Sequence, residues 1–262
     1  MGENRLAGEA LLDALESGEL RVAEREPDGH WRVHAWIKEA LLDVFRTSGL
    51  ALHGAPGQSP LGDFIDKAAL SVRRFGLDDG VRMVPGGSSI RRGAFLAPGV
   101  ICMPPAYVNL GAWVGAGTLI DSHALVGSCA QIGERVHLSA AAQIGGVLEP
   151  VGARPVIVED DCLIGGNSGL YEGVLVRRGA VIAAGVVLTA SSRVFDLTCD
   201  RELTGSRAEP IEIPENAVVV PGSRPASGDW ARERGLQVAC ALIVKYRDQR
   251  TDRATALEDA LR

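Results

Sequence analysis

The sequence predicts a mainly β protein built as a coil of short strands, and its spacing supports this prediction. An aliphatic residue or a cysteine recurs at every sixth position from Ile90 to Ile144, and the spacing resumes from Val158 to Val194. A period of six fits neither an α-helix nor a single strand, and a β-sandwich would not keep it through so many turns. The pattern therefore predicts a solenoid. Small or turn-forming residues that suit tight corners often follow these positions: Asn109, Gly115, Asp121, Gly127, Gly133, Ser139, Gly145 and Gly165.

Two interruptions of the repeat predict loops. From Ile144 to Val158 the step is fourteen positions where six would suffice, so eight additional residues must leave the coil. We place this loop at residues 146–156, and a second, polar and turn-rich excursion at 196–215. Loops on a rigid solenoid commonly carry binding groups, so both are candidate site segments.

Residues 1–85 are predicted to form a mostly helical amino-terminal domain. Apolar residues at helical spacing indicate a first helix between Leu6 and Leu15 and a second from Trp31 to Phe45. A short strand is expected at Leu20 to Glu24, and residues 49–66 form a connector rich in glycine and proline. Another short strand at Val81 to Val84 leads into the coil.

The coil itself is predicted to occupy residues 86–222, with a cap at 223–262. Val238 to Tyr246 favours a strand beside the last coil, and Arg253 to Leu261 favours a closing helix. Such caps are expected because an open solenoid end would pair with other chains.

Composition narrows the function classes. The chain of 262 residues has a net charge of −6, which disfavours nucleic acid or an acidic membrane as a partner. No segment resembles a signal peptide, and no apolar run approaches the roughly 20 residues that span a bilayer, so we expect a cytoplasmic protein. Five widely spaced cysteines without a CxxC motif favour neither a disulfide framework nor a zinc ribbon.

Four motifs stand out in the coil: Tyr107 to Ala112, Val126 to Gly133, Val136 to Ser139 and Ile144 to Pro150. They resemble the tetrahydrodipicolinate N-succinyltransferase family of hexapeptide-repeat acyltransferases. Outside the coil, Leu20 to Glu24, His30-Trp31 and Ala241 to Lys245 also match that family, so the resemblance covers most of the chain.

The repeat alone predicts a solenoid without fixing its handedness. The resemblance implies that this solenoid is a left-handed parallel β-helix. It also implies a homotrimer in which an acyl-CoA, with succinyl-CoA favoured over acetyl-CoA, meets an amino-acid acceptor of the lysine pathway between neighbouring subunits. The expected activity is therefore CoA-dependent N-acyl transfer in lysine and diaminopimelate biosynthesis.

Asp121 is the first candidate for the catalytic group. An amine attacks a thioester only when it is neutral, so the reaction needs an acceptor for its proton and donors for the oxyanion that forms. Asp121 occupies a corner where most equivalent residues are small, and it matches the family's catalytic aspartate in the motif Thr118 to Asp121. The alternative is a turn-forming aspartate that only accepts backbone hydrogen bonds.

The chain departs from the family where the acceptor should bind. The family has a Gly-Ala-Arg-Ser-Glu motif with a catalytic glutamate and a nearby arginine, but here Gly169 stands at the position of the glutamate and Asn167 at that of the arginine. Ser122-His123 replaces the family's threonine-tryptophan, and Gly115-Ala116 replaces an acidic pair. His123 is a candidate replacement base, since its unperturbed pKa near 6.5 suits neutral pH.

These departures leave alternatives open. One is a paralogue with a changed acceptor or an acetyl donor, as in biosynthesis of toxins of the tabtoxin type, and another is a catalytically silent regulatory relative. A β-helix lyase would need three zinc-binding histidines, but the coil contains only His123 and His137, so no metal is predicted. Beyond Asp121 and His123, the predicted substrate-binding residues are Asn167, Ser168, Gly169, Glu149, Ser139 and His137, and those for CoA are Gly145, Gly146, Gly166, Ala184 and Arg193.

Overall fold

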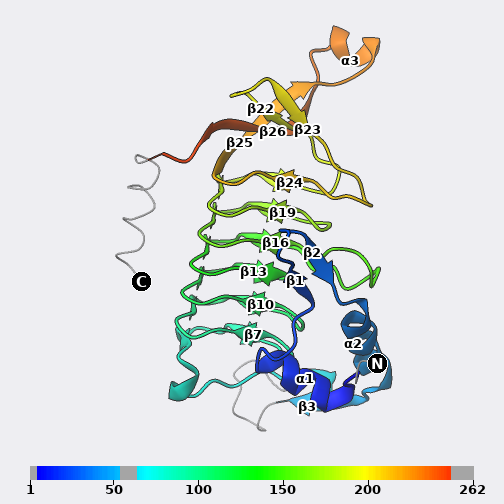
Figure 1. Cartoon of the computed structure of the whole chain (residues 1–262), viewed down its shortest axis with the longest axis vertical. Coiled ribbons are helices and arrows are strands. Elements are labelled where there is room, and N and C mark those ends of the chain that lie inside the picture. Colours follow the sequence, from blue (N-terminus) through cyan, green and yellow to red (C-terminus); the bar gives the residue numbers. More distant parts are fainter. Residues whose placement is uncertain (1–4, 54–63, 249–262) are drawn as a thin grey trace.

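The computed structural model describes residues 5–53 and 64–248, and its central feature is a tall stack of coils (Figure 1). The coils have three flat faces. Each coil contributes one short strand to each face, and the strands of a face pair in parallel. Face 1 contains β5 (Arg82–Met83), β8 (Ile101–Cys102), β11 (Leu119–Ile120), β14 (His137–Leu138), β17 (Leu163–Ile164), β20 (Val181–Ile182) and β25 (Ala217–Pro225).

The other two faces have the same construction. Face 2 contains β6 (Ser89–Ile90), β9 (Tyr107–Val108), β12 (Leu125–Val126), β15 (Gln143–Ile144), β18 (Gly169–Leu170) and β21 (Val187–Leu188). Face 3 contains β7 (Phe95–Leu96), β10 (Trp113–Val114), β13 (Gln131–Ile132), β16 (Ile157–Val158), β19 (Leu175–Val176) and β24 (Glu212–Ile213).

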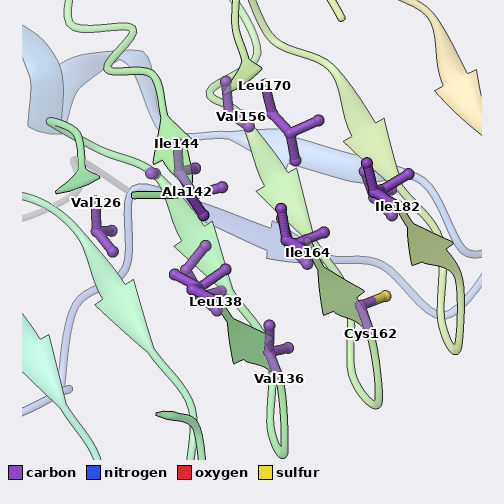
Figure 2. Close-up of a cluster of buried hydrophobic side chains, with 14 of the residues drawn as sticks. Val126, Val136, Leu138, Ala142, Ile144, Val156, Cys162, Ile164, Leu170 and Ile182 are labelled. Carbon is purple, nitrogen blue, oxygen red and sulfur yellow. The ribbon is translucent and has the colours of Figure 1, made fainter. Parts of the chain in front are cut away.

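The aliphatic residue of each hexad points into the coil. In Figure 2, Leu138, Ile164 and Ile182 project from successive strands of face 1 into one cluster. All seventeen repeat positions from Ile90 to Val194 are buried, and none exposes more than 3% of its surface. Burying such a side chain contributes about 2 kcal/mol. The predicted parallel solenoid with one inward residue per hexad is therefore confirmed.

Some corners stack so closely that only glycine fits. At Gly127 an added Cβ would overlap the backbone nitrogen of Gly146 in the next coil, and φ is not positive there. Close approach of two backbones, and not an unusual φ, therefore explains the glycine at this corner.

The Gly127→Ala variant should consequently be less stable. Because the neighbouring backbone has no free space, we expect a loss of about 2–3 kcal/mol of unfolding free energy, measured by chemical denaturation. Gly152→Ala is the matched control, since a Cβ there meets no atom within 4 Å. Equal stability of the two variants would contradict this explanation of the corner.

The amino-terminal segment is more mixed than the predicted helical domain. It contains α1 (Gly8–Glu16) and α2 (Ala35–Thr47), a short 3-10 helix η1 (Leu77–Asp79), and two antiparallel hairpins. The hairpins are β1 (Ala23–Arg25) with β2 (Trp31–Val33), and β3 (Leu50–His53) with β4 (Phe64–Lys67).

The predicted helix from Trp31 is wrong over its first turn. Residues Trp31–Val33 form β2, and α2 begins only at Ala35. The reason is tertiary, because the Trp31 indole Nε1 donates a hydrogen bond to the buried carboxylate of Glu159, 3.0 Å away on the coil. The β1–β2 hairpin thereby lies along face 3 (Figure 1).

The first predicted loop packs against the amino-terminal segment. Leu11 of α1 and Leu41 of α2 share an apolar cluster with coil residues, and Leu148 from the loop packs on this cluster. In addition, the ammonium of buried Lys38 donates to the Ala153 carbonyl at 2.7 Å, and burial lowers the pKa of Lys38. This loop therefore fixes the two parts of the chain together.

The second predicted loop, 196–215, is not without structure. It lies between β22 (Val194–Asp196) and β25, and it contains β23 (Arg201–Leu203) and β24, which completes face 3. A further difference is that β25 continues through residue 222, where the coil was expected to end.

The carboxy-terminal strand is confirmed as β26 (Gln237–Tyr246), which pairs with β25 and β22 above the last coil (Figure 1). A short helix α3 (Asp229–Glu233) precedes it and was not predicted. The helix expected from Arg253 to Leu261 lies outside the described residues. Within residues 5–53 and 64–248, no helix is long and apolar enough to cross a membrane.

Candidate functional site

The corners between faces 1 and 2 bring most of the predicted site residues together. These corners, residues 121–124, 139–142, 165–168 and 183–186, are stacked in register and are called the Asp121 edge. Asp121, His123, Ser139, Gly166, Asn167 and Ala184 all lie on this edge. Residues more than sixty positions apart in sequence are therefore only a few coils apart in space.

Asp121 lies at the first position of its corner. Its backbone N–H bonds to the carbonyl of Leu138 at 2.9 Å, and its Oδ1 accepts the N–H of Ser122 at 2.7 Å. The carboxylate is partly exposed, and Ser139 occupies the equivalent position one coil further on. The geometry thus includes the turn-forming hydrogen bond, while the second carboxylate oxygen accepts no hydrogen bond from any described residue.

His123 and Asn167 occupy equivalent left-handed corner positions, with φ of 63° and 56°. Their backbone N–H groups bond to the preceding coil, His123 to Pro105 at 2.7 Å and Asn167 to Ala140 at 3.0 Å. Both residues are exposed. The backbone is therefore fixed by the coil while the imidazole and the amide remain accessible to a ligand.

A column of unused backbone donors runs along this edge. Within the described part of the chain, the N–H groups of Ala140, Gly166 and Ala184 donate no hydrogen bond, whereas Ser122 N–H is taken by Asp121. Their side chains are methyl groups or hydrogen, and Ala140 and Ala184 are exposed. Because parallel strands are about 4.8 Å apart, the donors recur at about that spacing.

Two residues predicted to bind substrate, Ser168 and Gly169, do not present a side chain on the surface of the Asp121 edge. Ser168 is 1% exposed and its hydroxyl donates to the Ala183 carbonyl at 2.9 Å, so its side chain belongs to the interior and the substrate-binding prediction is corrected. Gly169 begins β18 on face 2 and is buried beneath the ring of Tyr171. Tyr171 was not predicted, because its place in the repeat gives no sign that its ring turns back over face 2.

Three predicted residues lie on another edge. Gly145, Gly146 and Glu149 belong to the corners between faces 2 and 3, residues 109–112, 127–130, 145–156 and 171–174, which we call the Gly145 edge. Gly146 closely approaches the backbone of the preceding coil, and Glu149 is exposed in the loop. Face 2 separates these residues from Asp121, so the structure does not gather them into one cluster with it.

His137 and Arg193 are also apart from this cluster. His137 starts β14 on face 1, paired with Leu119 and Leu163, and is 9% exposed. Arg193 precedes β22 at the end of the coil, where its Nε is 2.8 Å from the carboxylate of Glu202. This arginine is therefore already paired with an acid.

A cavity of about 400 Å³ lies between the β1–β2 hairpin and face 3, away from the Asp121 edge. Arg21 stacks over the Trp113 ring, 4.5 Å from its centroid, and its Nε donates to Gln131 at 2.7 Å. Burial lowers the pKa of Arg21 to about 10. Gly115 and Ala116 line this cavity, so these two departures from the family pattern lie at a separate place from Asn167 and Gly169.

We find no candidate metal-binding group in the parts of the chain that the structure describes. Neither residues 5–53 nor 64–248 contain a group of three or more histidine, cysteine, aspartate or glutamate side chains placed to hold an ion. The site is instead formed by a carboxylate, polar side chains and backbone donors.

Comparisons with known proteins give the family. A sequence profile described as the tetrahydrodipicolinate N-succinyltransferase N-terminal domain matches residues 2–47, and one described as the hexapeptide repeat of succinyl-transferase matches 155–190. A 2,3,4,5-tetrahydropyridine-2,6-dicarboxylate N-succinyltransferase of Bradyrhizobium diazoefficiens is 46% identical, covering 100% of this chain and 91% of the relative.

Further relatives agree. Enzymes of the same name from Nitrobacter winogradskyi and Chelativorans are 46% and 43% identical, each over 100% of this chain and covering 91% and 90% of the relatives. A crystal structure of a Campylobacter jejuni protein, assigned as a 2,3,4,5-tetrahydropyridine-2-carboxylate N-succinyltransferase, gives a TM-score of 0.54 at 18% identity. It covers 91% of this chain and 63% of that one, and supports the fold.

Three such enzymes are 43–46% identical over the whole of this chain, and the family's amino-terminal profile also matches it. These matches confirm the resemblance seen in the motifs and the assignment of the chain as an acyltransferase. The chain belongs to the tetrahydrodipicolinate N-succinyltransferase family.

Proposed function

We propose that this protein transfers a succinyl group from succinyl-CoA to the amino group of an acceptor derived from tetrahydropyridine-2,6-dicarboxylate. The observation that carries the proposal is the column of free N–H groups on the Asp121 edge, with a partly exposed carboxylate at its start. The names of the full-length relatives supply the substrate class.

In the proposed reaction the amine nitrogen forms an amide bond to the thioester carbon, and the carbon–sulfur bond breaks. The Asp121 carboxylate accepts a proton from the amine, and that proton is finally passed to the sulfur of the leaving thiol. During attack the thioester oxygen becomes negatively charged, and a backbone N–H of the column, that of Ala140 nearest to Asp121, stabilises it. His123 is the second candidate for handling the proton.

The same column suits the donor molecule. The pantetheine arm of CoA is extended and carries amide carbonyls, which need regularly spaced hydrogen-bond donors. The N–H groups of Gly166 and Ala184 provide such donors beside side chains too small to obstruct the arm. We therefore assign Gly166 and Ala184 to the donor, and leave Gly145, Gly146 and Arg193 outside the proposed site because they lie elsewhere.

We further propose that the β-helix is left-handed and that the active molecule is a homotrimer with sites between subunits, as the family resemblance implies. The Asp121 edge is open along its length, which is consistent with closure by a neighbouring copy. Acyl-CoA is a cytoplasmic metabolite, and this supports the cytoplasm as the place of reaction.

One second candidate is favoured by a specific feature. Asn167 replaces an arginine, so a bidentate cationic partner for a carboxylate is missing at this position. A different acceptor, or acetyl-CoA as donor, would fit this loss.

The two candidates are separated by a thiol-release assay with purified protein. Succinyl-CoA and acetyl-CoA are each offered with tetrahydrodipicolinate, aminopimelate and related amino acids, and kcat/KM is compared for every pair. The proposal expects the highest value with succinyl-CoA and tetrahydrodipicolinate. A higher value for acetyl-CoA or another acceptor would favour the second candidate, and the absence of both turnover and CoA binding would overturn acyl transfer.

A further inference from the structure

Face 2 has one outward position that holds no side chain. The first residues of its strands are in register along the stack and point away from the core, and at this position β18 has Gly169, next to Gln143 and Val187. Although Val187 is 58% exposed, Gly169 is buried. Something therefore covers the face at this point.

The cover is the phenol ring of Tyr171. A Cβ added to Gly145 would be 2.7 Å from Tyr171 Cδ1, and one added to Gly169 would be 2.9 Å from both Cζ and the hydroxyl oxygen. The ring thus starts at the Gly145 edge and lies across face 2 over two glycines. Its hydroxyl ends where a side chain of residue 169 would stand.

This position places the hydroxyl beside the Asp121 edge. Gly169 follows Asn167 and Ser168 directly, so the oxygen lies next to the corner that carries the exposed Asn167 amide. The hydroxyl makes no hydrogen bond with any residue in the described part of the chain, and the side chain is only half-buried. A tyrosine hydroxyl can donate one hydrogen bond, and because this one has no partner among the described residues it is available to a ligand.

We propose that Tyr171 is a specificity-determining residue whose hydroxyl donates a hydrogen bond to a carboxylate of the amino-acid acceptor. The inference rests on the proposed function and adds the group that contacts the acceptor above Gly169. Two coil steps, roughly 10 Å, separate the coil of Asp121 from that of Tyr171, a separation that an extended amino dicarboxylate bridges. The acceptor amine lies at Asp121 and its distal carboxylate at Tyr171 and Asn167.

Two neutral groups at this place have a chemical consequence. Hydrogen bonds from a phenol and an amide orient a carboxylate without adding a formal positive charge, whereas an arginine would add charge and a forked geometry. The site therefore selects the acceptor by the position of its oxygen atoms.

The first test is Tyr171→Phe, which keeps the ring over the glycines and removes only the hydroxyl. Loss of one hydrogen bond should raise KM for the acceptor about 3- to 10-fold, with kcat within about twofold and KM for acyl-CoA unchanged. Tyr107→Phe is the matched control, because Tyr107 occupies an outward position on the same face three strands away, and it should leave all three constants unchanged.

The second test uses the contact itself. Gly169→Ala must displace the ring, because its Cβ would overlap Tyr171, so it should also raise KM for the acceptor. In a Tyr171→Ala background the three atoms nearest to that Cβ are absent, so the same change should have no further effect on KM. Such non-additivity is expected only when the two residues act through one contact.

The outcomes separate this inference from the proposed function. If Tyr171→Phe leaves KM for the acceptor unchanged while Asp121→Asn loses activity, the role of Tyr171 is overturned and the proposed acyl transfer is retained. A rise in KM for acyl-CoA alone overturns the assignment to the acceptor. A wild-type protein that neither turns over nor binds CoA overturns both.

Discussion

Replacement of Asp121 by asparagine is expected to lower kcat about 10²- to 10⁴-fold, the usual contribution of a positioned general base. Asparagine retains an Oδ1 atom that can accept the Ser122 N–H, which is 2.7 Å from the aspartate oxygen. The corner therefore keeps its hydrogen bond and the coil keeps its shape. Only the capacity to take a proton from the amine is removed, and steady-state thiol release measures the effect.

The control for this variant is a second corner aspartate. Asp160 accepts the N–H of Glu134 at 2.9 Å but lies at a different edge, between faces 3 and 1. Asp160→Asn should keep kcat within about twofold of wild type. Unchanged turnover in Asp121→Asn would remove Asp121 from the mechanism, and a large loss in His123→Ala would then identify the imidazole as the base.

The largest stability effect is expected at Glu159. This carboxylate is 5% exposed and joins the coil to the amino-terminal hairpin, because it accepts hydrogen bonds from Trp31 Nε1 at 3.0 Å and Arg177 at 3.1 Å. It also accepts the backbone N–H of Arg178 at 3.1 Å. Glu159→Ala leaves these donors without their acceptor, so we expect a loss of about 2–4 kcal/mol in unfolding free energy.

An exposed ion pair supplies the comparison for Glu159. Arg193 and Glu202 are 2.8 Å apart, but 47% and 36% of their side chains are exposed. Glu202→Ala should therefore cost less than about 1 kcal/mol in the same denaturation experiment. Equal losses for the two variants would show that burial of Glu159 does not control its contribution.

The repeat made the coil predictable, whereas the amino-terminal hairpin depended on distant contacts. Each inward residue, such as Leu138, stands at a fixed step from the next, so the core could be assigned from spacing alone. Trp31 fits a helical stripe equally well in sequence. It becomes a strand residue because Glu159, far along the chain, accepts its indole hydrogen bond.

The candidate site was likewise predictable where it follows the repeat and unpredictable where it depends on loop path or side-chain packing. Asp121, His123 and Asn167 share one edge because the strand register stacks equivalent corners on top of one another. They could be identified from the sequence because they are polar residues at corners where most residues are small. Glu149 was assigned from a motif, but the loop leaves the coil at another edge. The position of Tyr171 could not be predicted, because only side-chain packing decides that its ring covers Gly169.

A crystal structure with CoA and an acceptor analogue tests the central claim most directly. We expect the pantetheine carbonyls to accept hydrogen bonds from the N–H groups of Gly166 and Ala184, and the acceptor amine to lie beside the Asp121 carboxylate. CoA bound along the Gly145 edge, or an acceptor amine remote from Asp121, would contradict it.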